Sequence, residues 1–213
     1  MALTLDDYVV AHSSAEHPYL HALYRATHTQ LVRPRMASGQ MQGQLLRMLA
    51  QLIAPQTVVE IGTYSGYSAL AMASGMPAGS ALHTFEINDE QEDFTRPWLE
   101  GSPWSQSVDI RLHIGDIFAL LPPMGLRLDL VFVDANKRDY CDYYDLVMPM
   151  LRVGGYLIAD NTLWDGHVVD PERCDPQTEG IRAFNTRVAD DARVEQVILP
   201  IRDGLTLIRK ISD

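Results

Sequence analysis

Short apolar runs rich in β-branched residues alternate with helix-like stretches between Thr57 and Asp160, and this alternation constrains the fold most. The runs read TVVEI, SALHTFEI, VDIRLHI, LDLVFVD and GGYLIAD. Strands that alternate with helices form parallel sheets covered by helices on both faces. We therefore expect an α/β fold built around a parallel sheet.

The two ends of the chain follow different patterns. The N-terminal part has helical periodicity, and its apolar positions form two faces: Tyr19, Leu20, Leu23 and Tyr24, then Leu45, Leu46, Leu49, Leu52 and Ile53. After Asp160 comes an irregular segment rich in Asp, Pro and Gly, and a helix is expected from about Thr178 to Ala189. The last strand-like runs, RVEQVILPI and LTLIRKI, are joined through Asp203 and Gly204, a dipeptide that favours an antiparallel hairpin.

The length and composition indicate one cytosolic domain. At 213 residues the chain suits a single α/β domain spanning residues 1–213. No apolar run approaches the roughly 20 residues that a membrane-spanning helix needs, and the N-terminus lacks the basic and apolar regions of a signal peptide. The formal net charge of -11, without a basic stripe, argues against nucleic acid as a partner. Cys141 and Cys174 are expected to be reduced thiols.

A glycine-rich turn follows the first strand-like run. In EIGTYSGYSAL, Gly62 and Gly66 stand between a strand and a helix, where the backbone can approach a ligand closely and offer it free N–H groups. The GTYSG pattern differs from the GxGxxG of dinucleotide enzymes, because its side chains crowd the place of a pyrophosphate. Glu60 supplies a carboxylate suited to a cationic amino-acid group, and Glu86, at the end of the next strand, can accept both hydroxyls of a ribose. The pair indicates a nucleoside attached to an amino acid.

Two turns near this edge of the sheet allow simpler interpretations. The glycine-rich turn by itself could merely close a tight connection between a strand and a helix. Gly115-Asp116-Ile117, after VDIRLHI, could contact an adenine, or Asp116 could simply cap a short helix. The pairing with Glu86 favours the ligand-binding interpretation of the first turn, whereas both interpretations of the second stay open.

Acidic and amide side chains end the next two strands. Asp134 follows VFV, and Asp160 with Asn161 follow LIA. If these strands are neighbours, the three side chains converge at the edge where α/β sheets bind their substrates. Converging carboxylates repel each other unless a positive charge lies between them, and their oxygens suit a hard divalent cation such as Mg²⁺. The alternative, in which one Asp caps a helix and the other only ends a strand, explains each residue alone but not the set.

The seven histidines suggest a second metal hypothesis. His17 and His21 are spaced for one face of a helix. Neither an HExxH pattern nor a Cys partner accompanies them, so a zinc site there is not favoured.

Taken in order, these motifs resemble the cation-dependent O-methyltransferases, the family of catechol O-methyltransferase and the caffeoyl-CoA O-methyltransferases, in a bacterial-type form. The likeness covers nearly the whole chain, from RPRMASGQMQGQLL through EIGTYSGYSAL, FEIN, VDANKRDY and ADNTLWDG to LPIRDGLTLIRK. It implies a Rossmann-like class I methyltransferase fold, with a mostly parallel seven-stranded sheet, helices on both faces and a C-terminal antiparallel hairpin. Residues 1–55 would form helices that cover the active site, and the protein would be a homodimer.

The resemblance also implies the cofactors and the site. S-adenosylmethionine would donate the methyl group, and Asp134, Asp160 and Asn161 would hold a divalent cation, with Mg²⁺ expected and Mn²⁺ or Ca²⁺ as alternatives. Lys137 matches the residue regarded as general base in the catechol enzymes and forms the expected catalytic pair with Asp134. The expected cofactor contacts are Met36, Glu60, Gly62, Tyr64, Ser68, Glu86, Ile87, Asp116, Ile117, Asp134 and Tyr143. The expected substrate contacts are Met36, Lys137 and Trp164.

Two of these assignments have alternatives. Family members commonly show GDA or GPA where this chain has Gly115-Asp116-Ile117, so the resemblance supports adenine packing at Ile117 less strongly. Trp164 is expected either to contact an aromatic substrate or to pack on the core as part of a lid.

The expected reaction is methyl transfer to a hydroxyl of a small vicinal diol such as a catechol or polyphenol. Two substrate oxygens on the cation would lower the pKa of the nucleophilic hydroxyl. Lys137 would remove or electrostatically accommodate the remaining proton, while the site holds oxygen, carbon and sulfur in line. One alternative is methylation of a hydroxylated uridine in transfer RNA, against which the acidic charge argues. Another class of alternative is a nucleotide-binding dehydrogenase or a non-catalytic binding module.

Overall fold

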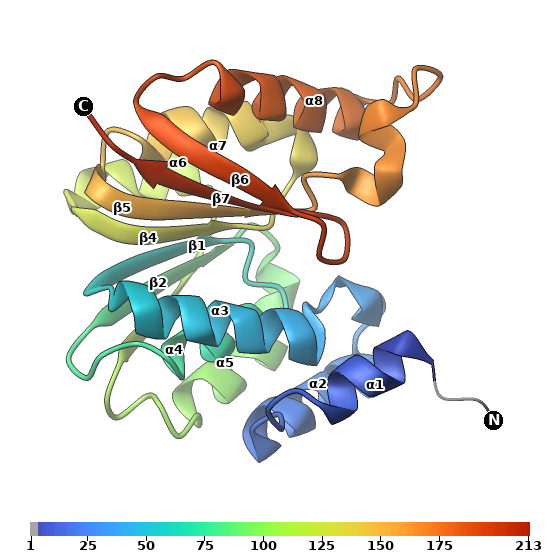
Figure 1. Cartoon of the computed structure of the whole chain (residues 1–213). Coiled ribbons are helices and arrows are strands. Elements are labelled where there is room, and N and C mark those ends of the chain that lie inside the picture. The colour runs from blue at the N-terminus through green and yellow to red at the C-terminus, as the bar shows by residue number, and fades with distance from the viewer. Residues whose placement is uncertain (1–3) are drawn as a thin grey trace.

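The computed structural model describes residues 4–213 and is built around one twisted seven-stranded sheet (Figure 1). The strands are β1 (Thr57–Ile61), β2 (Ala81–Glu86), β3 (Asp109–Ile114), β4 (Leu128–Val133), β5 (Leu151–Asp160), β6 (Val194–Leu199) and β7 (Leu205–Lys210). Their order in the sheet is β3-β2-β1-β4-β5-β7-β6. The first five strands pair in parallel, whereas β7 pairs antiparallel with both β5 and β6. The predicted parallel sheet and C-terminal hairpin are therefore confirmed.

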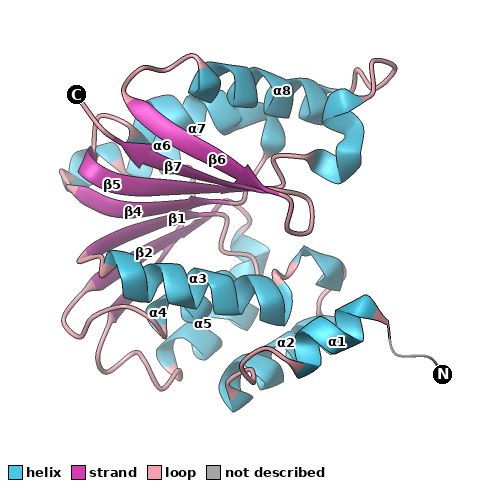
Figure 2. Cartoon of the chain, viewed as in Figure 1, coloured by secondary structure: helices cyan, strands magenta, loops and turns pink. Residues whose placement is uncertain are grey.

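Helices cover both faces of this sheet (Figure 2). The α-helices are α1 (Leu5–Ala11), α2 (Pro18–Gln30), α3 (Gly39–Ile53), α4 (Tyr67–Ala73), α5 (Glu92–Glu100), α6 (Ile117–Leu120), α7 (Tyr140–Val147) and α8 (Pro176–Ala189). Short 3-10 helices are η1 (Pro34–Met36), η2 (Asp89–Gln91), η3 (Pro122–Met124), η4 (Lys137–Asp139) and η5 (Trp164–Val169).

Alternate side chains of the central strands enter two apolar clusters. Val59 and Val131 join the cluster formed with α6, α7 and α8, whereas Val58 and Leu130 join the one formed with α2, α3, α4 and α5. This follows from the two-residue period of a strand. Because both faces of the central strands are covered, β1 and β4 are buried and apolar along most of their length. The polar residues that follow them are left at the carboxyl edge of the sheet.

Two elements begin earlier than the sequence predicts. Helix α8 begins at Pro176 rather than near Thr178, because the Asp175 side chain accepts hydrogen bonds from the backbone N–H groups of Gln177 and Thr178 at 3.2 and 3.1 Å. Strand β5 begins at Leu151 rather than at GGYLIAD, because its pairing with β4 continues across an irregularity.

Of the N-terminal helices, α2 and α3 pack against one face of the sheet, whereas the described side chains of α1 are exposed. Leu20 and Leu23 of α2 are buried in the cluster with α3 and α4. The chain then turns through η1 before α3 begins. None of the helices in residues 4–213 is long and apolar enough to span a membrane.

Candidate active site

Two cavities lie at the carboxyl ends of the parallel strands and share part of their walls. The larger has a volume of about 910 Å³ and the smaller about 450 Å³. Residues that line both are Arg33, Met36, Gly62, Tyr64, Asp134, Ala135 and Asn136. This is the edge of an α/β sheet at which ligands bind.

The structure brings nearly all the predicted site residues to these cavities. The larger is lined by Met36, Gly62, Tyr64, Glu86, Ile87, Asp116, Ile117, Asp134 and Tyr143. The smaller is lined by Met36, Gly62, Tyr64, Ser68, Asp134, Lys137, Asp160, Asn161 and Trp164. Glu60 lines neither cavity. Of the N-terminal 55 residues that were expected to cover the site, the walls include several from Gln30 to Ser38 and none from α1.

The turn after β1 requires glycine at its first position. Gly62 has φ +96°, and a Cβ added there would lie 2.1 Å from the carbonyl oxygen of Asp134. The backbone of the turn therefore packs in direct contact with the residue that follows β4, Asp134. Tyr64 also has a positive φ, and its backbone N–H donates to Glu86 Oε2 at 2.8 Å. The Asn88 N–H donates to the other oxygen of Glu86 at 2.9 Å, so two backbone amides hold this carboxylate at the larger cavity.

Glu60 lies beneath the cavity walls, contrary to its expected place beside a cationic ligand. Its carboxylate oxygens accept hydrogen bonds from the hydroxyls of Ser68 and Thr84, both at 2.5 Å, and the residue is fully buried. Burial raises the pKa of Glu60 from 4.5 to about 8, although these two hydrogen bonds oppose the rise. The carboxyl group has no exposed oxygen for a ligand, and in this structure it holds Ser68, which lines the smaller cavity.

The turn after β3 shows the capping role that the sequence allowed. The Asp116 side chain accepts from the Phe118 N–H at 2.9 Å and begins α6. Asp116 and Ile117 also line the larger cavity, so capping does not remove them from the site. The Phe118 ring stacks on Tyr143, with 5.4 Å between centroids, and gives this wall an aromatic surface.

Lys137 is buried between two polar partners. Its Nζ donates to Asp134 Oδ1 at 2.7 Å and to the Tyr140 hydroxyl at 2.8 Å. Burial alone would lower the pKa of this lysine, but the negative charge of Asp134 and the polar hydroxyl of Tyr140 outweigh burial and raise the pKa above its ordinary value. Lys137 is thus a cation held against the end of β4. A cation at this place suits electrostatic accommodation of a negatively charged substrate oxygen.

Asp160 ends β5 and Asn161 follows it, beside Asp134 at the end of β4. Strands β4 and β5 are parallel neighbours, with Val133 opposite Ala159, so the two Asp residues follow paired positions. The backbone N–H of Asn161 donates to Asp160 Oδ1 at 2.8 Å. Burial and the nearby charge of Asp134 raise the pKa of Asp160 to about 6. The two carboxylates and the amide thus line one cavity, as the sequence predicts.

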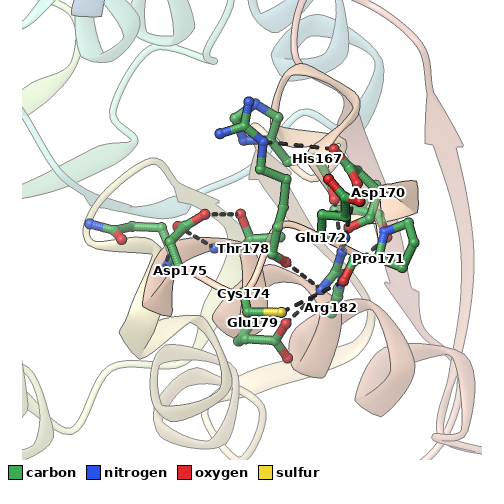
Figure 3. A network of polar contacts seen from close by, with 12 residues as sticks. His167, Asp170, Pro171, Glu172, Cys174, Asp175, Thr178, Glu179 and Arg182 are labelled. Atoms are coloured by element: carbon green, nitrogen blue, oxygen red, sulfur yellow. Dashed lines mark hydrogen bonds and ion pairs between the residues drawn. The ribbon is translucent and has the colours of Figure 1, made fainter.

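The loop after these residues is held by one arginine. Arg182 of α8 donates to the backbone carbonyls of His167 at 2.9 Å, Val168 at 3.0 Å and Arg173 at 2.7 Å, and also to that of Asp170 (Figure 3). Trp164 begins this loop with φ +46° and lines the smaller cavity, with its ring centroid 6.0 Å from Lys137 Nζ. Of this loop, Trp164 lines the smaller cavity, while Arg182 binds the part of the loop that follows it.

The histidine alternative finds no support in the structure. His17 caps α2 by accepting from the Tyr19 N–H at 3.2 Å, and His21 contacts Glu16 at 3.1 Å. Among residues 4–213, no group of three or more His, Cys, Asp or Glu side chains is placed to hold a metal ion. The predicted cation site is a different kind of group, because it combines two Asp residues with Asn161.

Sequence reasoning missed two residues that touch predicted ones, Tyr140 and Gln42, and a third, Arg202, that touches Gln42. Tyr140 donates to the Asp160 carbonyl at 2.9 Å while it accepts from Lys137. Gln42 of α3 donates to the Asp160 side chain at 2.5 Å, and Arg202 of the β6–β7 turn donates to Gln42. Tyr140 stands three residues after Lys137 in VDANKRDY, so helical spacing offered a signal for it. Gln42 is 118 positions from Asp160 and 160 positions from Arg202, and only the tertiary fold brings them together.

A comparison with known families decides between the possible activities. The family model of the O-methyltransferases matches residues 10–211. The chain belongs to the O-methyltransferase family. This membership confirms the predicted methyltransferase and argues against the dehydrogenase alternative.

Individual relatives support the assignment. This O-methyltransferase is 35% identical to the mouse catechol O-methyltransferase domain-containing protein 1 over 208 residues, which cover 96% of the chain and 79% of the relative. It is 35% identical over 189 residues to caffeoyl-CoA O-methyltransferase 1 of Zea mays, covering 83% of the chain and 72% of that relative.

Solved structures confirm the class I methyltransferase fold. The Bacillus cereus O-methyltransferase in complex with SAH superimposes with a TM-score of 0.88 at 25% identity, covering 97% of this chain and 96% of that one. TomG of Streptomyces achromogenes, in complex with SAM, gives 0.88 at 27% identity, with 98% and 96% covered.

Proposed function

We propose that this O-methyltransferase uses S-adenosylmethionine and a divalent cation to methylate a hydroxyl of a small vicinal diol such as a catechol or polyphenol. The observation that carries the proposal is the smaller cavity, which is lined by Asp134, Asp160 and Asn161 together with Lys137. That cavity shares Gly62, Tyr64 and Asp134 with the larger one.

The larger cavity suits the methyl donor. The turn at Gly62 has no room for a side chain, so only glycine fits there. Glu86 presents a carboxylate that two backbone amides hold in place, and this carboxylate suits the hydroxyls of a ribose. The B. cereus and S. achromogenes relatives are solved with SAH and SAM, and they share this fold over nearly the whole chain. S-adenosylmethionine supplies an already activated methyl group when bound.

The donor set in the smaller cavity fits a hard divalent cation. Two carboxylates and one amide oxygen are ligands that Mg²⁺ or Mn²⁺ accept in octahedral coordination with water or substrate oxygens. Asp134, Asp160 and Asn161 would hold it at the ends of two paired strands. Such a cation supplies Lewis acidity that lowers the pKa of a chelated hydroxyl.

The protein's own side chains orient the substrate and stabilise the negative charge on its oxygen. Lys137 presents a buried ammonium group, fixed by Asp134 and Tyr140, beside the place where a diol oxygen would become negative. Trp164 and Met36 supply apolar walls for an aromatic ring. The residues thus hold the nucleophilic oxygen in a defined orientation, which is the main task in methyl transfer. We also propose that a small molecule, and not a nucleic acid, is the substrate, and that the protein is a homodimer.

A methyl-transfer assay over a panel of catechols and polyphenols tests this function. Labelled S-adenosylmethionine is supplied with Mg²⁺, with EDTA, and with EDTA followed by excess Mg²⁺. Transfer RNA that carries the hydroxylated uridine without its methyl group is included as a separate substrate. We expect transfer to at least one diol, loss of transfer in EDTA and recovery with Mg²⁺. Full transfer in EDTA contradicts the cation site, and transfer only to RNA contradicts the substrate class.

A further inference from the structure

Gln42 contacts the carboxylate of Asp160 from a distant part of the chain. It lies in the first turns of α3, is buried with 1% of its surface exposed, and its Nε2 donates to Asp160 Oδ2 at 2.5 Å. The backbone N–H of Asn161 donates to the other oxygen, Oδ1, at 2.8 Å. Each oxygen of Asp160 therefore has one fixed donor, and the plane of the carboxylate is set from both sides.

Arg202 determines which way the Gln42 amide faces. An amide can be turned over, and the two orientations exchange its NH₂ and C=O ends. Arg202 Nη1 donates to Gln42 Oε1 at 3.1 Å, to the Ala37 carbonyl at 3.3 Å and to the Ser38 carbonyl. In the opposite orientation the NH₂ group would face the guanidinium and the C=O group would face the carboxylate. Both contacts would be repulsive, so Arg202 selects the orientation that donates to Asp160.

We infer that Arg202 and Gln42 are positioning residues that orient Asp160 for binding of the divalent cation. They act in series, as a relay in which Arg202 orients the Gln42 amide and the amide orients the carboxylate of Asp160. The inference rests on the proposed function, because it concerns the cation that Asp160 would hold. Neither residue is expected to touch the cation. Each donor occupies one lone pair of a carboxylate oxygen, which leaves a further lone pair on each oxygen of Asp160, a residue that lines the smaller cavity. Loss of such an outer hydrogen bond typically weakens metal binding about 10-fold to 100-fold.

A double-mutant cycle on metal affinity distinguishes action in series from independent effects. The variants are Gln42→Leu, which keeps the approximate size of the side chain but cannot donate, Arg202→Met, and the pair together. Matched controls are Gln51→Leu, an exposed position on the same helix, and Arg209→Met, an exposed arginine on β7. The measured quantity is the dissociation constant for Mn²⁺ by titration calorimetry, and the affinity for S-adenosylhomocysteine reports whether the fold and the cofactor cavity are intact.

The series arrangement predicts a particular pattern. Gln42→Leu weakens Mn²⁺ binding by about 10-fold to 100-fold, and Arg202→Met weakens it by a smaller factor. The double variant binds Mn²⁺ no more weakly than Gln42→Leu alone, because Arg202 acts only through the amide. The controls bind Mn²⁺ like the wild type, and affinity for S-adenosylhomocysteine is retained throughout.

Two results would overturn the inference in distinguishable ways. If the wild type binds Mn²⁺ and either single variant binds it equally well, or if their effects add in the double variant, the relay is refuted while the cation site stands. If the wild type itself binds no Mn²⁺, the proposed cation dependence fails and the relay fails with it. Should Gln42→Leu not fold, the exposed Arg202→Met decides the matter alone, since unchanged Mn²⁺ affinity in that variant refutes the relay.

Discussion

Replacing Glu60 with glutamine is expected to remove a pH-dependent loss of stability from the protein. The buried carboxyl group has a pKa of about 8 in the folded chain, against an ordinary value of 4.5 that applies when the chain is unfolded. Below pH 4.5 the group is protonated in both states and has no effect. As the pH rises above 4.5 the unfolded chain releases the proton while the folded chain retains it, so folding becomes less favourable until the pH passes about 8.

The magnitude follows from the two pKa values. The difference between about 8 and 4.5, at about 1.4 kcal/mol per pH unit, corresponds to roughly 5 kcal/mol in full. About 3 kcal/mol of this loss in the free energy of unfolding occurs between pH 5 and pH 8. Glutamine has no titrating proton, and the hydroxyls of Ser68 and Thr84 can donate to its carbonyl or accept from its amide. The Glu60→Gln variant should therefore fold, and its free energy of unfolding should lack this dependence on pH.

Urea unfolding at intervals from pH 5 to pH 8 measures the effect. The free energy of unfolding of the wild type should fall relative to that of Glu60→Gln by about 3 kcal/mol across this range. Taking the difference between the two proteins removes the contributions of other titrating groups, such as Asp160. Glu172→Gln, at an exposed position in the loop before α8, serves as the control and should parallel the wild type. Parallel curves for Glu60→Gln and the wild type would refute the assignment of a buried, protonated Glu60.

Three further substitutions test other parts of the site. Gly62→Ala should lower the free energy of unfolding by about 2 kcal/mol or more, because its Cβ would meet the Asp134 carbonyl at a positive φ; an unchanged urea midpoint would contradict this. Lys137→Met should lower methyl transfer by about 100-fold or more while S-adenosylhomocysteine binding is retained, because the negative oxygen loses its ammonium partner; near-normal turnover would exclude its catalytic role. Arg182→Met should speed protease cleavage between residues 165 and 175 and raise the KM for the diol, because the loop loses its hydrogen bonds to the guanidinium; cleavage and KM like those of the wild type would show that the loop is held by other contacts.

The arrangement of the fold could be predicted from the sequence because its signals are local or repeated. Each strand is an apolar run of strand length, and Asp203-Gly204 marks the hairpin turn that the structure shows. The start of β5 could not be placed in the same way. Gly154 and Gly155 are typical of a turn, yet the strand runs through them from Leu151. Pairing with β4 decides that boundary, and such pairing is not a local property of the sequence.

The part of the candidate site that follows the strand ends could be predicted from the sequence. Parallel strands bring their carboxyl ends together, so Asp134 and Asp160 could be placed near each other from their positions alone. The environment of a side chain could not be predicted in this way. Glu60 also lies near a strand end, but it points into the packed layer beneath the cavities, where Ser68 and Thr84 from two other elements hold its carboxyl group.

The most direct test of the cation site is a crystal structure of the protein with Mn²⁺ and S-adenosylhomocysteine, measured at a wavelength where manganese scatters anomalously. We predict one anomalous peak in the smaller cavity, within about 2.0–2.3 Å of an oxygen from each of Asp134, Asp160 and Asn161. The account is contradicted if S-adenosylhomocysteine is bound in the larger cavity while the manganese peak lies elsewhere or is absent.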